Sequence, residues 1–254
     1  MIPALDGLRV VEIECLSLHE AHDEERLSRV RARIEAEGVQ RNPVIASPFG
    51  ENYLVLDGAH RVQALSGLEA NLALVQIVEP PAFTESWAHL VRAAGIEKLR
   101  NTEAVEMSES KSGNDWLAEV ETAEGSRLWL RSRERGLSAE VRALWGMQGG
   151  YPRDGEVRRV GADEEVKPVG DEAIVRYRAF SPGELIEVVR FGAILPAGIT
   201  RFRIDERVLG VRFPLTSLRS KDTAATNTDL RAFVEERWGE NRIRRYAEPV
   251  VLFE

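Results

Sequence analysis

Cysteine is almost absent from this sequence of 254 residues, and so are long apolar runs. Its one cysteine, Cys15, excludes an internal disulfide and a cysteine-based metal site. No eighteen apolar residues follow one another, and the N-terminal stretch MIPALDGLRVVEIE carries acidic residues where a secretion signal would be apolar. We therefore expect a cytoplasmic protein with no membrane partner.

An excess of positive charge is also lacking, since 34 Lys and Arg face 42 Asp and Glu, for a formal net charge of -8. Proteins that neutralise the phosphates of DNA usually present a basic face. The arginines at 153–159 and 237–245 are interleaved with acidic residues, which is typical of a solvated surface. We expect no nucleic-acid partner. No heptad repeat indicates an oligomeric state.

Hydrophobic periodicity in the first 80 residues predicts a small domain of alternating strands and helices. A helix over 23–37 ends at Gly38, a residue that commonly terminates helices. Strands are predicted at 8–13, 43–47, 53–56 and 72–78, and a further helix at 58–65. The consecutive Pro80 and Pro81 end this region because proline interrupts regular structure.

The rest of the chain predicts a mixed domain. Ser181 with Glu184 three residues later, and Pro182 between them, is the signature of a helix start. Further predictions are helices at 84–94 and 230–238, hairpins at 116–120 with 128–131 and at 199–204 with 208–213, and a closing strand near 250–252. The fold class is thus α/β (α+β), with domains at 1–80 and 81–254 and the active site expected in the cleft between them.

The segment VLDGAHRVQAL at 55–65 is a strand that enters a tight glycine turn and then a helix. A helix N-terminus offers unpaired backbone N–H groups and about half a positive charge, and a preceding glycine allows a phosphate to approach closely. His60 and Arg61 add side-chain donors. Taken alone, the segment is also compatible with an ordinary strand-to-helix connection.

The spacing Gly58-x-x-Arg61-x-x-Ala64, preceded by GVQRNPV at 38–44, resembles the second signature box of ParB/sulfiredoxin-like domains. Three branches share this box. Sulfiredoxins carry a nucleophilic cysteine where this chain has Ala59, which excludes their chemistry. ParB proteins continue into a helix-turn-helix and a basic DNA-binding region, whereas this chain continues into Pro80, Pro81 and an acidic second region.

The third branch is the free L-serine kinase family, which this chain resembles at three places. These are DGAHR at 57–61, LSLHE at 16–20 and PAGITRF at 196–202. The resemblance implies a ParB/sulfiredoxin-like first domain and phosphoryl transfer from ATP or ADP to the hydroxyl of free L-serine. The product would be O-phospho-L-serine for siderophore or amino-acid biosynthesis. The alternative is a ParB-like nucleotide-binding regulator with a DNA or protein partner.

The resemblance also implies roles for particular residues. It makes Glu20 the general base, for which the alternative is an idle charge in the first turn of a helix. It places serine contacts at Thr200 and at Arg201, whose guanidinium would pair with the serine carboxylate.

Chemistry adds further candidates. Asp57, at the end of a strand, is expected to orient the serine hydroxyl or to hold Mg²⁺, unless it only caps a turn. Magnesium is implied because phosphoryl charge must be neutralised, and its ligands stay open. The nucleotide phosphates are expected at Gly58, Ala59, His60 and Arg61. Trp87 would wall the serine pocket or belong to the core.

Overall fold

The computed structural model describes residues 3–99, 102–111, 113, 115–151, 157–161 and 163–248. These residues form two compact units. Unit 1 takes its residues from 1–16, 24–79 and 205–254, and unit 2 from 17–23 and 80–204. The chain passes from unit 1 to unit 2 near residue 80, where the domain boundary was expected. However, residues 17–23 belong to unit 2 and not to the first domain, and residues from 205 onward belong to unit 1 and not to the second. Hydrogen bonds between distant segments explain the difference, as between Glu20 and Thr200 in unit 2 and between Val10 and Asn227 in unit 1.

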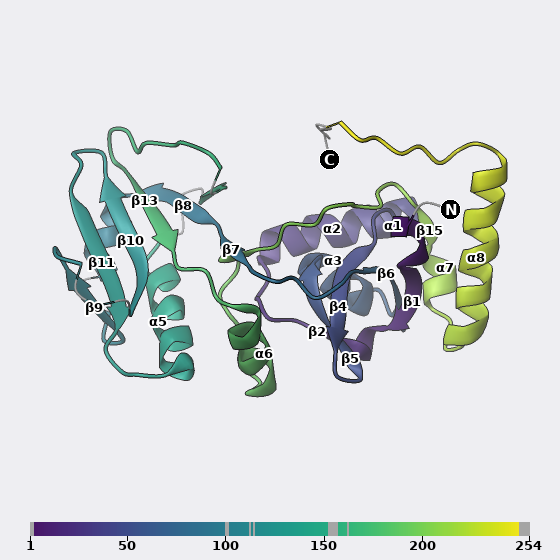
Figure 1. Cartoon of the computed structure of the whole chain (residues 1–254), viewed down its shortest axis with the longest axis horizontal. Coiled ribbons are helices and arrows are strands. Elements are labelled where there is room, and N and C mark those ends of the chain that lie inside the picture. The colour runs from purple at the N-terminus through teal and green to yellow at the C-terminus, as the bar shows by residue number, and fades with distance from the viewer. Residues whose placement is uncertain are drawn as a thin grey trace. The chain divides into compact units, whose positions relative to one another are not determined.

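Unit 1 is built on a five-stranded sheet with the order β1-β6-β4-β5-β2 (Figure 1). Strands β4 and β6 are parallel, whereas β1 pairs with β6 and β4 with β5 in antiparallel fashion. The strands are β1 (Leu8–Glu12), β2 (Leu16–Ser17), β4 (Val44–Phe49), β5 (Asn52–Asp57) and β6 (Leu72–Ile77). Every side chain from Leu72 to Val75 is fully buried, as expected for a central strand covered on both faces.

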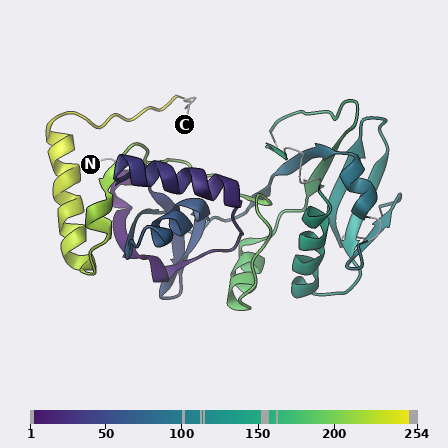
Figure 2. The ribbon, with the colours of Figure 1, turned by 180° about the vertical axis from the view of Figure 1, so that it is seen from behind.

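Helices cover this sheet. Figure 2 shows α2 (Glu24–Glu37) and α3 (Ala59–Gly67) in front of the strands, and the two helices pack against each other. Helix α8 (Thr223–Gly239) packs beside β1, where the side-chain amide of Asn227 donates to the carbonyl of Val10 and accepts from its N–H. The remaining elements are α1 (Pro3–Asp6), the 3₁₀ turn Ile13–Cys15, β15 (Phe213–Pro214) paired with β3 (Val39–Gln40), and α7 (Leu215–Leu218).

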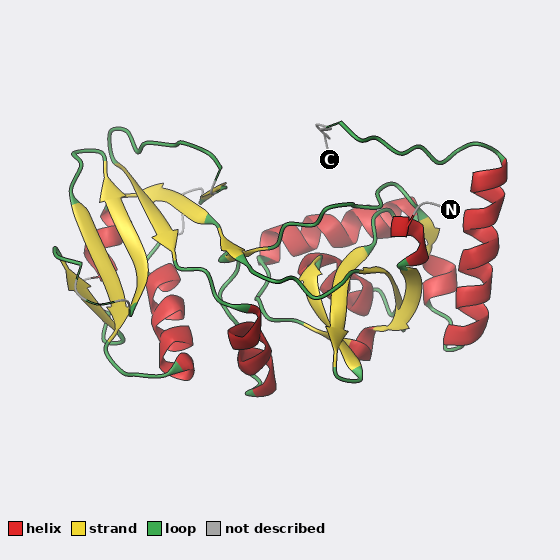
Figure 3. Cartoon of the chain, in the orientation of Figure 1, coloured by secondary structure: helices red, strands yellow, loops and turns green. Residues whose placement is uncertain are grey.

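Unit 2 contains a six-stranded antiparallel sheet with the order β12-β8-β13-β10-β11-β9. Figure 3 shows α5 (Leu137–Gly149) running along it, and α5 contacts β9 and β11. The strands are β8 (Ala88–Arg92), β9 (Val105–Ser108), β10 (Trp116–Thr122), β11 (Arg127–Ser132), β12 (Arg158–Val160) and β13 (Glu172–Tyr177). A short pair, β7 (Glu85–Ser86) and β14 (Thr200–Arg201), and the helices α4 (Ala94–Leu99) and α6 (Pro182–Arg190) complete the unit.

Several predicted elements are present in the structure, and two predictions are wrong. The capping box at Ser181 and Glu184 starts α6 as predicted. The predicted helix at 84–94 is instead β7 and β8, because β8 pairs with β12 on one side and β13 on the other. The predicted hairpin at 199–204 and 208–213 does not form, since Thr200–Arg201 pairs with β7 and Phe213–Pro214 with β3.

The predicted closing strand at 250–252 lies outside the described residues. Within the described part of the chain, no helix is both long and apolar enough to cross a membrane.

Candidate active site

In unit 1, the predicted phosphate turn joins the end of β5 to the start of α3. Asp57 is the last residue of β5, Gly58 is the N-cap of α3, and Ala59, His60 and Arg61 form its first turn. Gly58 has φ +111°, and a Cβ there would lie 2.8 Å from Nη2 of Arg61. The backbone conformation therefore favours glycine, and any side chain here would also make the guanidinium of Arg61 move.

The carboxylate of Asp57 is set between two arginines. Nη1 of Arg207 donates to Oδ2 at 2.5 Å, and Nη2 of Arg61 lies 3.6 Å from Oδ1. Partial burial of Asp57 opposes its ionisation, but the charges of Arg61 and Arg207 prevail and hold its pKa below the usual value. The end of β5 thus carries one carboxylate and two guanidinium groups beside a helix N-terminus, a combination suited to phosphate and its counter-ion.

In unit 2, the carboxylate of Glu20 is held by three consecutive backbone amides. Oε2 accepts from the N–H of Gly198 at 2.9 Å, and Oε1 accepts from the N–H groups of Ile199 at 2.9 Å and Thr200 at 2.5 Å. The hydroxyl of Thr200 also donates to Oε1 at 2.6 Å. Successive N–H groups that converge on one anion form a nest, and we call residues 198–200 the amide nest.

Glu20 is therefore not an idle charge at a helix start. Helix α2 begins four residues later, at Glu24, and Glu20 instead bridges to Leu195. Its neighbour His19 is buried, with Nε2 2.7 Å from the hydroxyl oxygen of Thr200. Because that hydroxyl gives its proton to Glu20, the histidine nitrogen is the donor. The motifs at 16–20 and 196–202, some 180 residues apart, meet here.

Arg201 lies next to the amide nest and is in contact with two carboxylates and one indole. Its Nη1 is 2.6 Å from Oδ1 of Asp163, and its Nε is 3.7 Å from Oε2 of Glu85. The guanidinium stands over the ring of Trp87, 4.7 Å from its centroid, as in a cation–π contact. Trp87 is thus neither on a helix nor in the core: it is partly buried and lies between β7 and β8.

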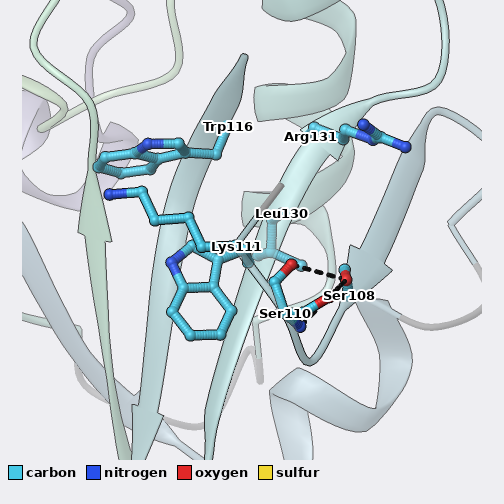
Figure 4. Close-up of a pocket in the computed structure, with 7 residues that line it drawn as sticks. Ser108, Ser110, Lys111, Trp116, Leu130 and Arg131 are labelled. Carbon is cyan, nitrogen blue, oxygen red and sulfur yellow. Dashed lines mark hydrogen bonds between the residues drawn. The ribbon is translucent and has the colours of Figure 1, made fainter. Parts of the chain in front are cut away.

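A separate shallow pocket on unit 2 shares no residue with these candidates (Figure 4). It holds roughly one water molecule, about 10 Å³. The ammonium of Lys111 lies 4.9 Å from the ring centroid of Trp116, and Figure 4 shows the two side chains together. The pocket is lined by Ser108, Ser110, Lys111, Trp116, Trp129, Leu130 and Arg131. We assign no part of the candidate site to this pocket.

Metal-ligating side chains do not gather in the described residues, where no three His, Cys, Asp or Glu residues form a cluster. Magnesium on a nucleotide needs only one or two carboxylates, since phosphate and water supply the other ligands. Asp57, at the phosphate turn, offers one such carboxylate. One carboxylate at this turn would therefore be enough for a magnesium ion that arrived with a nucleotide.

Two residues around the amide nest escape prediction from sequence. His89 of β8 donates from Nε2 to the carbonyl of Gly198 at 2.7 Å, and Gln148 of α5 donates to that of Ala197 at 3.1 Å. The one signal for His89 is its position within the apolar stretch AHLV at 88–91. Nothing in the sequence marks Gln148 as a neighbour of the amide nest, because only the folded chain brings α5 next to residue 197.

Comparisons with known proteins concern the chain as a whole. Across 98% of both chains, this chain is 25% identical to the ATP-dependent L-serine kinase SbnI of Staphylococcus aureus (strain NCTC 8325 / PS 47). The structure of C-terminally truncated SbnI matches with a TM-score of 0.81 and 21% identity, covering 94% of this chain and 100% of that chain. A free serine kinase in complex with AMP matches with a TM-score of 0.65 and 18% identity, covering 84% of this chain and 93% of that chain. No protein-family model matches. These likenesses confirm the mixed α/β fold.

Proposed function

We propose that this chain is a free serine kinase, which transfers the terminal phosphoryl group of ATP to the hydroxyl of free L-serine and releases O-phospho-L-serine and ADP. The predicted resemblance to free serine kinases is confirmed by the similarity to SbnI along the whole chain. The observation that carries the proposal is the meeting of Glu20 with Thr200, because it joins two of the three predicted motifs in one arrangement.

Unit 1 supplies the nucleotide side of the reaction. The N-terminus of α3 at Gly58–Arg61 receives the phosphates through backbone N–H groups and the guanidinium of Arg61. Magnesium neutralises phosphoryl charge when it is bound, with Asp57 as the ligand from the chain. We take ATP as the donor because SbnI is named as ATP-dependent. An enzyme that consumes ATP and carries one free cysteine fits the cytoplasm.

Unit 2 supplies the serine side. Glu20 takes the proton from the serine hydroxyl as its oxygen attacks the terminal phosphorus, the new P–O bond forms, and the bond to the departing ADP breaks. From the described residues, Oε2 of Glu20 accepts a single hydrogen bond, that of Gly198, so this oxygen has capacity for the serine proton. Arg201 binds the serine carboxylate, which takes the place of Asp163. Trp87, stacked under that guanidinium, walls the serine pocket.

The test is a direct assay of the purified full chain with Mg²⁺, L-serine and either ATP or ADP, with phosphoserine detected by mass spectrometry. We expect phosphoserine with ATP, none with D-serine, and none when EDTA removes the metal. Absence of phosphoserine with both nucleotides would refute the proposed function. Nothing in the comparisons favours the alternative, a nucleotide-binding regulator. Binding of duplex DNA that weakens steeply with salt would favour it.

A further inference from the structure

Three consecutive peptide groups, between residues 197 and 200, are each held at both ends. Their N–H groups form the amide nest that binds Glu20. Their carbonyl groups point the opposite way, as a trans peptide requires, and each meets a different donor. The carbonyl of Ala197 accepts from Gln148, that of Gly198 from Nε2 of His89, and that of Ile199 from the backbone N–H of Trp87.

His89 differs from the other two donors because it is a buried ionisable side chain. It is 2% exposed on β8, and its ring makes T-shaped contacts with the rings of Tyr151 and Tyr177. Burial, assisted by the charge of Arg159, lowers its pKa to about 4, against the hydrogen bond to Gly198, so the ring is neutral near pH 7.

A carbonyl oxygen only accepts, so the single proton of the neutral ring is on Nε2. The other ring nitrogen, Nδ1, is buried and has no hydrogen-bond partner among the residues that the structure describes. An apolar side chain in this place would avoid leaving that nitrogen unsatisfied. Burying Nδ1 without a partner therefore costs folding free energy, and a histidine at this position points to a function for the bond from Nε2.

The purpose follows from the backbone of Gly198. This residue has φ +76°, a backbone conformation that residues with a side chain rarely adopt, so a substitution here would be strained. Because a glycine restricts the neighbouring peptide planes least, their orientation depends on the hydrogen bonds that hold them. The peptide from Gly198 to Ile199 is the one that His89 holds by its carbonyl and whose N–H binds Oε1 of Glu20.

We infer that His89 is a positioning residue for the kinase reaction: it fixes the peptide between Gly198 and Ile199, and through it the carboxylate of Glu20. The inference rests on the proposed function, since positioning matters only if Glu20 acts on the serine proton. A catalytic group that moves by about 1 Å loses about 100-fold in rate, so a donor that fixes Glu20 has a large effect without touching substrate.

The experiment compares three variants of the full chain in the phosphoserine assay. His89→Phe keeps a buried ring and removes the donor. His89→Gln places an amide nitrogen close to where Nε2 lies and so restores the donor. Val91→Ala, two residues along the same strand and 4% exposed, is the matched control for lost packing in β8. His89→Leu replaces the phenylalanine variant if that variant does not fold.

We expect His89→Phe to lower kcat about 10- to 100-fold with an unchanged KM for ATP, His89→Gln to recover most of this loss, and Val91→Ala to keep the wild-type kcat. Equal kcat values for His89→Phe and Val91→Ala would overturn the inference, as would a failure of His89→Gln to recover activity in a folded protein.

A second measurement does not depend on activity. Hydrogen exchange of the amides of residues 198–200, followed by NMR, is expected to be faster in His89→Phe than in wild type and Val91→Ala. Unchanged exchange in these amides would overturn the positioning role. If the wild-type chain makes no phosphoserine, the proposed function fails, and this measurement still decides whether His89 holds the amide nest.

Discussion

Replacement of Glu20 by glutamine tests the base and its structural setting in one variant. The side chain keeps its shape, but it loses its charge, and one oxygen becomes an NH₂ group. The amide nest and the hydroxyl of Thr200 offer only donors to this side chain. If the remaining oxygen takes the place of Oε1, the new NH₂ faces the N–H of Gly198, so one hydrogen bond becomes a donor–donor contact.

The magnitude follows from these contacts. Hydrogen bonds to a charged group contribute about 1.5–3 kcal/mol each, and neutral ones about 0.5–1.5. One bond is lost and three are weakened, and because Glu20 is partly exposed, water recovers part of the loss. We expect Glu20→Gln to lower the free energy of unfolding by about 2–4 kcal/mol and kcat by about 10²- to 10⁴-fold, the usual contribution of a general base.

Two assays separate the roles. Urea unfolding measures stability, and the phosphoserine assay, run where the variant is fully folded, measures kcat. Thr200→Val serves as the comparison, because it removes one donor to the carboxylate while leaving the charge. Wild-type kcat in Glu20→Gln would refute the base assignment, and unchanged stability would refute the reasoning about the amide nest.

Three further predictions concern charge and backbone strain. Gly58→Ala is expected to cost about 1–3 kcal/mol of folding free energy, because an alanine would be strained at φ +111°. It should also weaken ATP binding in calorimetry, because its Cβ would displace the guanidinium of Arg61. Gly239→Ala is the control: it has no positive φ and open space around it, and it should cost nothing. Folding lowers the pKa of Asp57, so the free energy of unfolding should fall as the pH drops below about 4 and this carboxylate becomes protonated. The loss should be about 1 kcal/mol or less, because the side chain of Asp57 is 44% exposed. Urea midpoints measured against pH should not show this loss in Asp57→Asn. Asp163→Asn should lower the KM for serine roughly two- to fivefold by releasing the arginine that it pairs with, and a higher KM would contradict that competition.

Local signals in the sequence predicted much of unit 1. A glycine after an amphipathic segment marked the end of α2, and the alternation of strand, glycine turn and helix at 52–67 placed Asp57 and Arg61 correctly. The same reasoning failed at 84–94. There the apolar spacing suits a helix, but pairing on both sides of β8 provides more hydrogen bonds than an isolated short helix would.

The arrangement around Glu20 shows why sequence stops short of a site. The family resemblance marked Glu20 and Thr200 as functional, but nothing in either segment says that one binds the other across 180 residues. His89 is harder still, since its role depends on a carbonyl 109 residues away. Contacts of this kind depend on tertiary structure, which periodicity and turn chemistry do not encode.

The interleaving of the two units has a consequence for synthesis on the ribosome. The chain emerges from its N-terminus, so β1 leaves the exit tunnel more than 200 residues before Asn227, the residue of α8 whose amide bonds to Val10. Unit 2, whose last residue is Ile204, is complete as a polypeptide while unit 1 still lacks β15, α7 and α8. Nascent chains stalled far enough beyond residue 204 for unit 2 to leave the exit tunnel, but with α8 still inside it, should therefore show protease protection of unit 2 and not of unit 1.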